Sequence, residues 1–183
     1  SLGGARPKSS VVGDKGELWI AKFPSKNDLI DVGAWEKVVH ELAQEAGLDV
    51  SPARIEKFSG EHHAFLTRRF DRTTKQARLH FASAMTLLQR SDGDDASSGA
   101  SYLELAELLI SHGSQTDKDL AQLWRRILFF ICVSNTDDHL RNHGLLLDKK
   151  GWRLAPAYDM NPVATGDGLS LNISESDNAQ SLE

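Results

Sequence analysis

The feature that most constrains this chain is a polar segment enclosed by apolar ones. Residues 135–143 carry polar or charged side chains, with Leu140 as the exception. The segment follows the most apolar stretch of the chain, residues 127–133, and precedes a second apolar run at 145–147. Both apolar neighbours are expected to lie in the core, so the loop between them is held at its two ends. Fixed catalytic groups are often carried by loops of this kind.

The order of the expected secondary structure predicts two lobes. In the first part of the chain, strands are expected at 11–12, 17–23, 53–58 and 64–70, with one helix at 31–47. Further along, helices are expected at 81–88, 101–112 and 117–134, followed by a last hairpin of strands 145–147 and 152–154. We therefore predict an α+β fold with a small β-rich N-terminal lobe, residues 1–72, and a mostly helical C-terminal lobe, residues 73–183.

The two long helices have recognisable faces and ends. Apolar residues recur at helical spacing along residues 31–47 and predict its buried stripe: Val32, Trp35, Val38, Val39, Leu42, Ala43 and Ala46. Asp31 is expected to cap this helix, and Gly47 suits its end. Either Asp117 or Thr116 is expected to cap the helix at 117–134.

Composition argues against a free-standing nucleic-acid binder. The 183 residues include 21 Lys and Arg against 26 Asp and Glu, a net charge of −5, whereas such binders usually carry a basic excess. Cys132 is the single cysteine and lies in an apolar run, so we expect a buried, inert thiol and no internal disulfide. With no apolar leader and no membrane-length apolar run in the sequence, we expect a cytoplasmic protein.

The N-terminal part carries groups suited to binding phosphates. Lys22 lies in the middle of an apolar strand, where its charge can neutralise a nucleotide. Gly3 and Gly4 lie in the opening loop that precedes it, and a glycine-rich turn lets backbone N–H groups approach phosphate oxygens closely.

The C-terminal part carries groups suited to phosphoryl transfer. Asp137 and Asn142 are five residues apart, the spacing of base and metal ligand in the catalytic loop of protein kinases. Asp159 follows the last expected strand and adds a second carboxylate. Carboxylate and amide oxygens are the ligands that Mg²⁺ prefers. The order of these groups along the chain predicts an ATP-dependent phosphotransferase.

Other interpretations remain open at this point. Each group alone has a structural explanation, since Lys22 could protect an edge strand and Asp159 could cap a turn. His139 and His143 are four residues apart and could share a zinc ion in a metal-dependent hydrolase, although Gly144 argues against a continuous helix there. A third possibility is a module that binds nucleotide or a partner without turnover.

The chain resembles the HipA-like serine/threonine kinases. Residues 135–142 match the catalytic-loop pattern Asn-x-Asp-x-His-x-x-Asn, and residues 156–159 match the metal motif Pro-x-Tyr-Asp. Residues 1–8 resemble the phosphate loop, Lys22 lies in the Ala-Lys-Phe-Pro context of the strand lysine, and residues 69–72 read Arg-Phe-Asp-Arg, like the segment that links the lobes. The resemblance implies a two-lobed protein-kinase-like fold.

The resemblance also implies site residues. Asp137 would be the catalytic base, with His139 near the phosphates, and Asn142 and Asp159 would hold Mg²⁺. ATP would contact Gly3, Gly4, Ala5, Arg6, Pro7, Lys8, Lys22, Arg68, Arg69, Phe70, His139, Asn142, Tyr158 and Asp159. Glu36 and Glu41 are both candidates for the acidic partner of Lys22.

Regulation and partners follow only from the resemblance. Ser1 matches a serine whose autophosphorylation would expel the phosphate loop, since close to two added negative charges repel bound ATP. The family pattern implies the toxin of a type II toxin–antitoxin system, a DNA-binding antitoxin like HipB, and a protein substrate such as a tRNA-charging enzyme. Members are longer, so we expect this chain to be the kinase region of a longer protein.

Overall fold

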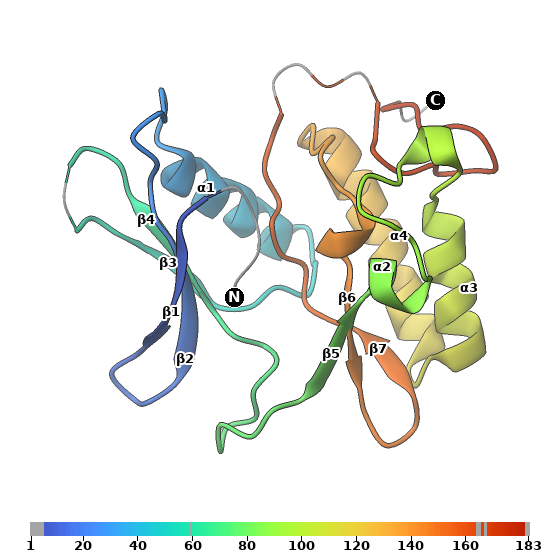
Figure 1. Cartoon of the computed structure of the whole chain (residues 1–183), viewed down its shortest axis with the longest axis horizontal. Helices are drawn as coiled ribbons and strands as arrows, with labels where there is room; N and C mark the ends of the chain where they lie inside the picture. Colours follow the sequence, from blue (N-terminus) through green and yellow to red (C-terminus); the bar gives the residue numbers. More distant parts are fainter. Residues whose placement is uncertain (1–5, 59, 164–165, 167, 182–183) are drawn as a thin grey trace.

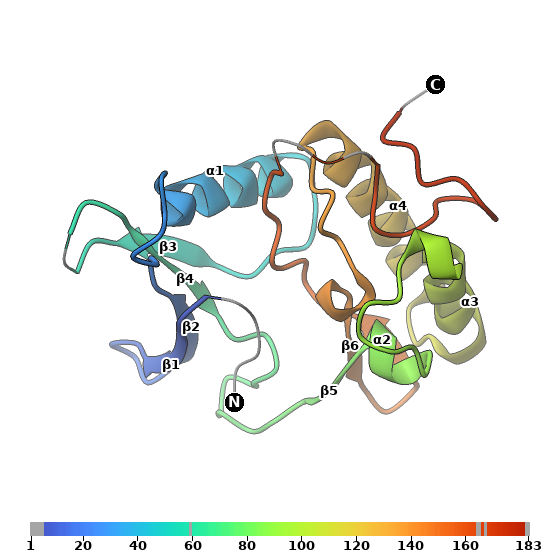
Figure 2. The same ribbon diagram turned by 45° about the horizontal axis from the view of Figure 1, so that its top comes forward.

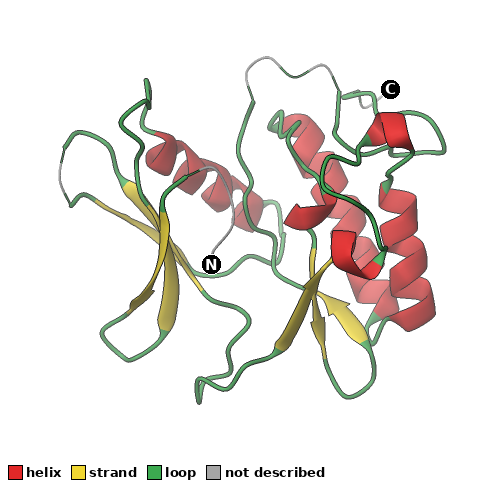
Figure 3. Cartoon of the chain, viewed as in Figure 1, coloured by secondary structure: helices red, strands yellow, loops and turns green. Residues whose placement is uncertain are grey.

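The computed structural model describes residues 6–58, 60–163, 166 and 168–181. These residues form two lobes, each built around its own antiparallel sheet (Figures 1 and 3). The strands are β1 (Lys8–Val12), β2 (Leu18–Lys22), β3 (Ala53–Glu56), β4 (Ala64–Arg68), β5 (His80–Ser83), β6 (Gly144–Leu147) and β7 (Trp152–Leu154). The helices are α1 (Val32–Glu45), α2 (Ala84–Leu87), α3 (Tyr102–His112) and α4 (Thr116–Cys132), with 3₁₀ turns η1 (Ala96–Ser98) and η2 (Leu140–Asn142).

The N-terminal lobe is a four-stranded sheet of order β1-β2-β4-β3, and α1 packs on β3 and β4. Alternation along β2 separates its two faces. Trp19 and Ala21 are buried in a small apolar cluster on one face. Lys22 points to the other face, where it meets α1, and its ammonium group lies 5.8 Å from the ring centre of Phe65. The sheet therefore directs one cation toward the helix.

The C-terminal lobe combines a three-stranded sheet, order β5-β6-β7, with helices α3 and α4, which both pack on β7. Its core is mostly aliphatic and includes the fully buried Leu105, Leu109, Leu145 and Leu171. Ser101 opens α3, within the predicted helix at 101–112, with a capping box that also uses Glu104. This core anchors both ends of the loop that connects α4 to β6.

A second apolar cluster joins the two lobes. Val39 and Ala43 of α1 pack with Phe130 of α4 and with Ala157 and Met160 from the segment after β7. In both views this segment runs between α1 and α4 (Figures 1 and 2). The chain beyond β7 is thus enclosed by elements of both lobes.

The predicted buried stripe of α1 was wrong in part. Trp35, Val38 and Leu42 are exposed, and the side facing the protein carries Glu36 and His40 beside Val39 and Ala43. The physical reason is that Glu36 pairs with Lys22, and His40 hydrogen-bonds the Ser51 carbonyl. Hydrogen-bond partners inside the lobe, more than apolar periodicity, therefore decide which side of α1 is buried. Asp31 does cap α1, accepting a bond from the Ala34 N–H at 3.1 Å.

The helix predicted at 81–88 was also wrong in its first half. His80–Ser83 form β5, because β6 offers a strand partner, and only the residues after Ser83 are helical. The Ser83 hydroxyl oxygen accepts a bond from the Thr86 N–H at 3.2 Å and so starts α2.

Two expectations for α4 were wrong. Gln115, not Thr116 or Asp117, precedes the first helical residue, and its side chain makes no capping bond. The Thr116 hydroxyl instead donates to the Leu109 carbonyl. Cys132 is exposed. It follows the buried Phe130 by two residues, roughly 200° around the helix, and so points outward. Among the described residues, no helix combines the length and apolar character that crossing a bilayer requires.

Candidate active site

Lys22 joins charges from both lobes. Its ammonium group donates to Asp159 Oδ1 at 2.6 Å and forms an ion pair with Glu36. The side chains of Lys22 and Glu36 are 10% and 7% exposed, so this pair is nearly dry, while that of Asp159 is 32% exposed. One strand, one helix and the segment after β7 therefore meet at a single ammonium group.

Lys22 and Asp159 hold each other in their ionised forms, whereas burial outweighs Lys22 at Glu36 and raises the pKa of that carboxyl. Burial alone would lower the pKa of Lys22, but the carboxylates of Glu36 and Asp159 outweigh it and raise that pKa above its usual value. Burial opposes ionisation of Asp159, yet Lys22, followed by Lys8 and His139, holds the pKa of Asp159 below its usual range. Asp159 is thus an anionic oxygen donor at neutral pH.

A second lysine lies beside Lys22. Lys8 of β1 is paired directly with Lys22 of β2, so both side chains leave the same face of the sheet. Like charges directly opposite each other are unfavourable unless anions compensate them. Glu36 and Asp159 lie within electrostatic reach of Lys8 and supply part of that compensation. A polyphosphate bound on this face would supply more.

The loop between α4 and β6 presents one carboxylate and one amide. Asp137 is exposed, whereas Asn142 at the end of η2 is buried. The side-chain nitrogen of Asn142 donates to the Asp137 carbonyl at 3.2 Å. The amide oxygen of Asn142 is therefore directed elsewhere and is the atom type that Mg²⁺ takes. The Asn142 amide oxygen and the Asp159 carboxylate are both oxygen donors of the type that a hard cation takes.

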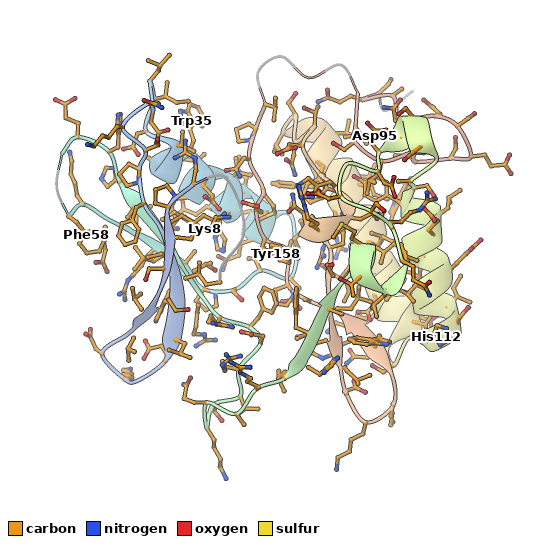
Figure 4. All side chains as sticks on the ribbon, viewed as in Figure 1. Lys8, Trp35, Phe58, Asp95, His112 and Tyr158 are labelled. Atoms are coloured by element: carbon orange, nitrogen blue, oxygen red, sulfur yellow. The ribbon has the colours of Figure 1, made fainter. Side chains whose placement is uncertain are left out.

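The segment carrying Asp159 is tied to the same loop. The Tyr158 hydroxyl donates to the Arg141 carbonyl at 2.6 Å. The Tyr158 ring packs on Phe70, which lies between the lobes, with ring centres 5.6 Å apart. The backbone of Asp159 has a φ of +58°. Residues other than glycine seldom adopt this left-handed conformation, and it is enriched at functional sites. Figure 4 labels Tyr158 and Lys8, which belong to opposite lobes.

The predicted phosphate loop lies only partly within the described residues. Ser1, Gly3, Gly4 and Ala5 fall outside them. Arg6 is engaged with Asp28 through two bonds, at 2.5 and 2.7 Å, and the Pro7 carbonyl accepts the Phe23 N–H. Of residues 6–8, Lys8 is the one that faces the Lys22 cluster.

The predicted ATP contacts Arg68, Arg69 and Phe70 lie at the end of β4 and just after it. The N–H groups of Arg68 and Arg69 bond to the carbonyls of Pro52 and Leu18, so they serve the sheet. The Arg69 side chain pairs with Asp71. Phe70 lies where the chain passes from one lobe to the other and contacts Tyr158, so it is the member of this group nearest the Asp159 segment.

The two histidines of the zinc hypothesis have separate partners. His143 is fully buried, and its Nε2 lies 2.6 Å from an oxygen of Asp138. His139 Nε2 lies 3.0 Å from Arg141 and close enough to Asp159 to help keep it ionised. Leu140–Asn142 form a 3₁₀ turn, not the α-helix that a shared metal at this spacing requires. Among the described residues, no group of three or more His, Cys, Asp or Glu is placed to hold a metal ion.

Two features of the site were not resolved by sequence reasoning. The partner of Lys22 is Glu36, while Glu41 pairs on the surface with Lys37 at 2.6 Å. Asp138 is 1% exposed and holds the loop from within, although it is adjacent to the exposed Asp137 and has the same chemistry. Neither adjacency nor helical spacing distinguishes these residues, because their burial depends on partners remote in the chain.

A cavity of about 160 Å³ adjoins the loop between α4 and β6 on the side of the C-terminal lobe. Its walls include Met85, Asp92, His139, Leu140 and Arg141. Arg141 forms an ion pair with Asp92, so the acidic loop after α2 is joined to the loop that carries Asp137.

Comparisons with known proteins show the family of this chain. The family model described as "HipA-like C-terminal domain" matches residues 1–183. A Haemophilus influenzae protein named "Putative kinase" is 30% identical over 154 residues, covering 77% of this chain and 44% of its own length. The Sinorhizobium fredii protein named "Putative kinase Y4mE" is 28% identical, covering 93% of this chain and 44% of its own length. The chain thus spans less than half of each relative.

Two solved structures share the fold. HipA of Shewanella oneidensis, in a complex with HipB and operator DNA, superposes with a TM-score of 0.80 over 98% of this chain and 48% of its own, at 19% identity. The proinflammatory kinase CtkA of Helicobacter pylori gives a TM-score of 0.64 over 84% of this chain and 54% of its own, at 17% identity. The predicted two-lobed, protein-kinase-like fold is confirmed.

Proposed function

Because the chain belongs to the family of HipA-like C-terminal domains, we propose that it is the ATP-binding and catalytic part of a serine/threonine protein kinase. The observation that carries the proposal is the bridge from Lys22 to Glu36 and Asp159. Protein kinases need a strand lysine paired with a helix glutamate, beside an aspartate that holds metal. The proposed division of labour follows the lobes, with nucleotide contacts from residues 1–72 and catalytic groups from residues 73–183.

Lys22 and Lys8, with the rest of residues 3–8, would hold the phosphates of ATP. Their position on one face of the sheet supports this role. The Asp159 carboxylate and the Asn142 amide oxygen would hold Mg²⁺, which when bound neutralises charge on the phosphates. Phe70 and the neighbouring backbone would border the adenine, and Tyr158 would keep Asp159 against the catalytic loop.

Asp137 would act as the base. Its exposed carboxylate is open to an incoming protein, as a proton acceptor for a substrate hydroxyl must be. The hydroxyl oxygen forms a bond to the γ-phosphorus while the bond from that phosphorus to the bridging oxygen of ADP breaks. The hydroxyl proton passes to Asp137, and ADP leaves.

Phosphoryl transfer from labelled ATP to proteins of a bacterial lysate tests this function. Asp137→Asn should lower the rate about 10²–10⁴-fold, the usual contribution of a general base. Asp159→Asn should abolish stabilisation of the fold by Mg-ATP in thermal melts. Asp14→Asn, in the exposed β1–β2 turn, is the matched control and should behave as wild type. Wild-type rates in both active-site variants would refute the proposal, and a wild-type protein that Mg-ATP fails to stabilise would favour a non-catalytic module.

The wider role is proposed by analogy with the HipA–HipB–DNA complex. The protein would be the toxin of a type II pair, restrained by a small DNA-binding antitoxin like HipB, and would phosphorylate a partner such as a tRNA-charging enzyme. Growth arrest on expression, relieved by co-expression of such an antitoxin and absent with Asp137→Asn, is the expected result. Arrest that persists with Asp137→Asn would contradict it.

Ser1 is the proposed site of autophosphorylation. A phosphate there would add close to two negative charges beside the phosphate-binding residues and disfavour ATP. Mass spectrometry after incubation with Mg-ATP should find phosphate on the N-terminal peptide of the wild type and none in Asp159→Asn. An unmodified peptide in an active wild-type preparation would count against this mode of control.

A further inference from the structure

We propose that Asp138 is a positioning residue, which sets the distance between the catalytic base and the metal-binding amide through a buried bond to His143. The inference rests on the proposed function, because it assigns roles to Asp137 and Asn142. Asp138 directly follows Asp137, and His143 directly follows Asn142. One residue of each neighbouring pair serves the site, and the other is enclosed by the core.

Burial separates the two aspartates. Asp137 is exposed, while Asp138 is 1% exposed and His143 is completely buried. One oxygen of Asp138 accepts the Tyr102 hydroxyl at 2.7 Å and lies 2.6 Å from His143 Nε2. The His143 ring meets the Tyr102 ring edge-on, with centres 5.6 Å apart. Asp138 is therefore held by Tyr102 of α3 on one side and by His143, just before β6, on the other.

Two hydrogen bonds, here called the ties, close the loop between α4 and β6. The Asn142 side chain bonds the Asp137 carbonyl, and the His143 side chain bonds the Asp138 carboxylate. Both ties span five residues and begin at consecutive positions. Rotation of Asp137 relative to Asn142 would break both ties, so the pair fixes the geometry that base and metal ligand need. Displacement of a catalytic group by about 1 Å can cost about a hundredfold in rate.

A buried cation balances Asp138. Arg126 of α4 is 1% exposed, lies within electrostatic reach of Asp138, and donates to the carbonyl of Ala155. Ala155 is four residues before Asp159, so the same arginine supports the strand end that leads to the proposed metal ligand. Burial and the Asp138 charge raise the pKa of Tyr102, so its hydroxyl stays protonated as a donor. Burying a charged group costs free energy of desolvation, and apolar residues of similar volume often stabilise a fold as well as or better than a buried ion pair does. Stability alone therefore does not account for a buried Asp138. A role in geometry explains its presence here.

Variants of His143 separate positioning from packing. Glutamine can place its side-chain nitrogen near the position of Nε2 and keep the bond, whereas leucine fills the site without a donor. Three properties would be measured in each variant: hydrogen exchange at residues 136–142 without ligand, the affinity for Mn²⁺ with a non-hydrolysable ATP analogue, and kcat against KM for ATP. Loss of a residue that orients a metal ligand typically costs 10- to 100-fold in metal affinity or activity.

His143→Leu should therefore weaken Mn²⁺ binding and lower kcat by about 10- to 100-fold, with faster exchange in the loop and little change in KM for ATP. His143→Gln should recover most of each loss. Tyr102→Phe removes one hydroxyl and should change all three properties in the same direction but less, and it decides the question if His143→Leu does not fold. Wild-type Mn²⁺ affinity and loop exchange in a folded His143→Leu, or in Tyr102→Phe, would overturn the proposal. If the wild type transfers no phosphate, the proposed function fails, and Mn²⁺ affinity and exchange still decide whether Asp138 positions the loop.

Discussion

Replacing Lys22 by methionine tests the charge cluster in depth. Methionine keeps much of the length of the side chain but leaves the carboxylate of Glu36, 7% exposed, without its cation. Breaking a buried ion pair by removing one partner costs about 3–5 kcal/mol of unfolding free energy. The second pair adds no more than about 1 kcal/mol, because Asp159 is 32% exposed and water screens it. We expect a loss of about 3–5 kcal/mol at pH 8.

The loss should depend on pH with a definite sign. Burial already raises the pKa of Glu36 above its ordinary value of 4.5, although Lys22 acts to lower it. Removing Lys22 should therefore raise the pKa of Glu36 further, so that the folded variant binds a proton more tightly than the unfolded chain. The contribution of Glu36 to the stability of the variant is then greatest below pH 4.5 and is lost as the pH rises through the folded-state pKa. The deficit relative to wild type should therefore be smaller at pH 5 than at pH 8.

Urea denaturation followed by far-ultraviolet circular dichroism measures both quantities. The double variant Lys22→Met/Glu36→Leu replaces the pair by apolar groups and should regain most of the stability while remaining inactive. Lys37→Met, which breaks the exposed pair with Glu41, is the matched control and should cost about 0.5 kcal/mol or less. A loss below about 1 kcal/mol at pH 8, or a double variant no more stable than the single one, would refute the reasoning.

Three further predictions address other contacts. Tyr158→Phe removes the bond to the Arg141 carbonyl and should cost about 1 kcal/mol in denaturation while lowering kcat more than it changes KM; an unchanged kcat would contradict the tie between Asp159 and the catalytic loop. Burial lowers the pKa of His40 from 6.5, so the unfolded chain takes up a proton at a higher pH than the folded one, and the unfolding free energy should fall as the pH drops below 6.5. Denaturation across this range should show a shallower fall in His40→Gln than in wild type. An equal fall in both proteins would assign the effect to other groups. Ser101→Ala removes the cap of α3 and should lower the unfolding free energy by about 1 kcal/mol without loss of activity, which denaturation and phosphoryl transfer together would check.

Much of the fold could be predicted because its signals are local. The Asp31 cap of α1 depends on residues within a few positions of one another, since Asp31 accepts the bond from the Ala34 N–H. The spacing between Asp137 and Asn142 is also local, since both lie in one short loop. These features arise wherever the same residues occur in the same order, so sequence reasoning found them.

The errors occurred where a remote partner decides the outcome. Residues 80–83 are a strand because β6 lies alongside, and no property of residues 81–88 indicates that partner. The packed side of α1 carries Glu36 and His40 because Lys22 of β2 and the Ser51 carbonyl, just before β3, are their hydrogen-bond partners. From sequence alone, a polar residue on a helix is assigned to the surface. Its burial costs desolvation free energy, which only a hydrogen-bond partner from elsewhere in the chain offsets.

The sequence by itself determined which chemical groups the protein has and in what order, namely a strand lysine, a loop aspartate with its asparagine, and a carboxylate after the last strand. Only the tertiary structure decided that Lys22 meets Asp159 across 137 residues, that Glu36 and not Glu41 completes the pair, and that Asp138 turns inward where Asp137 turns outward. The physical reason is that ionisation and hydrogen bonding depend on what surrounds a side chain, and those surroundings form only when both lobes pack around the same segment.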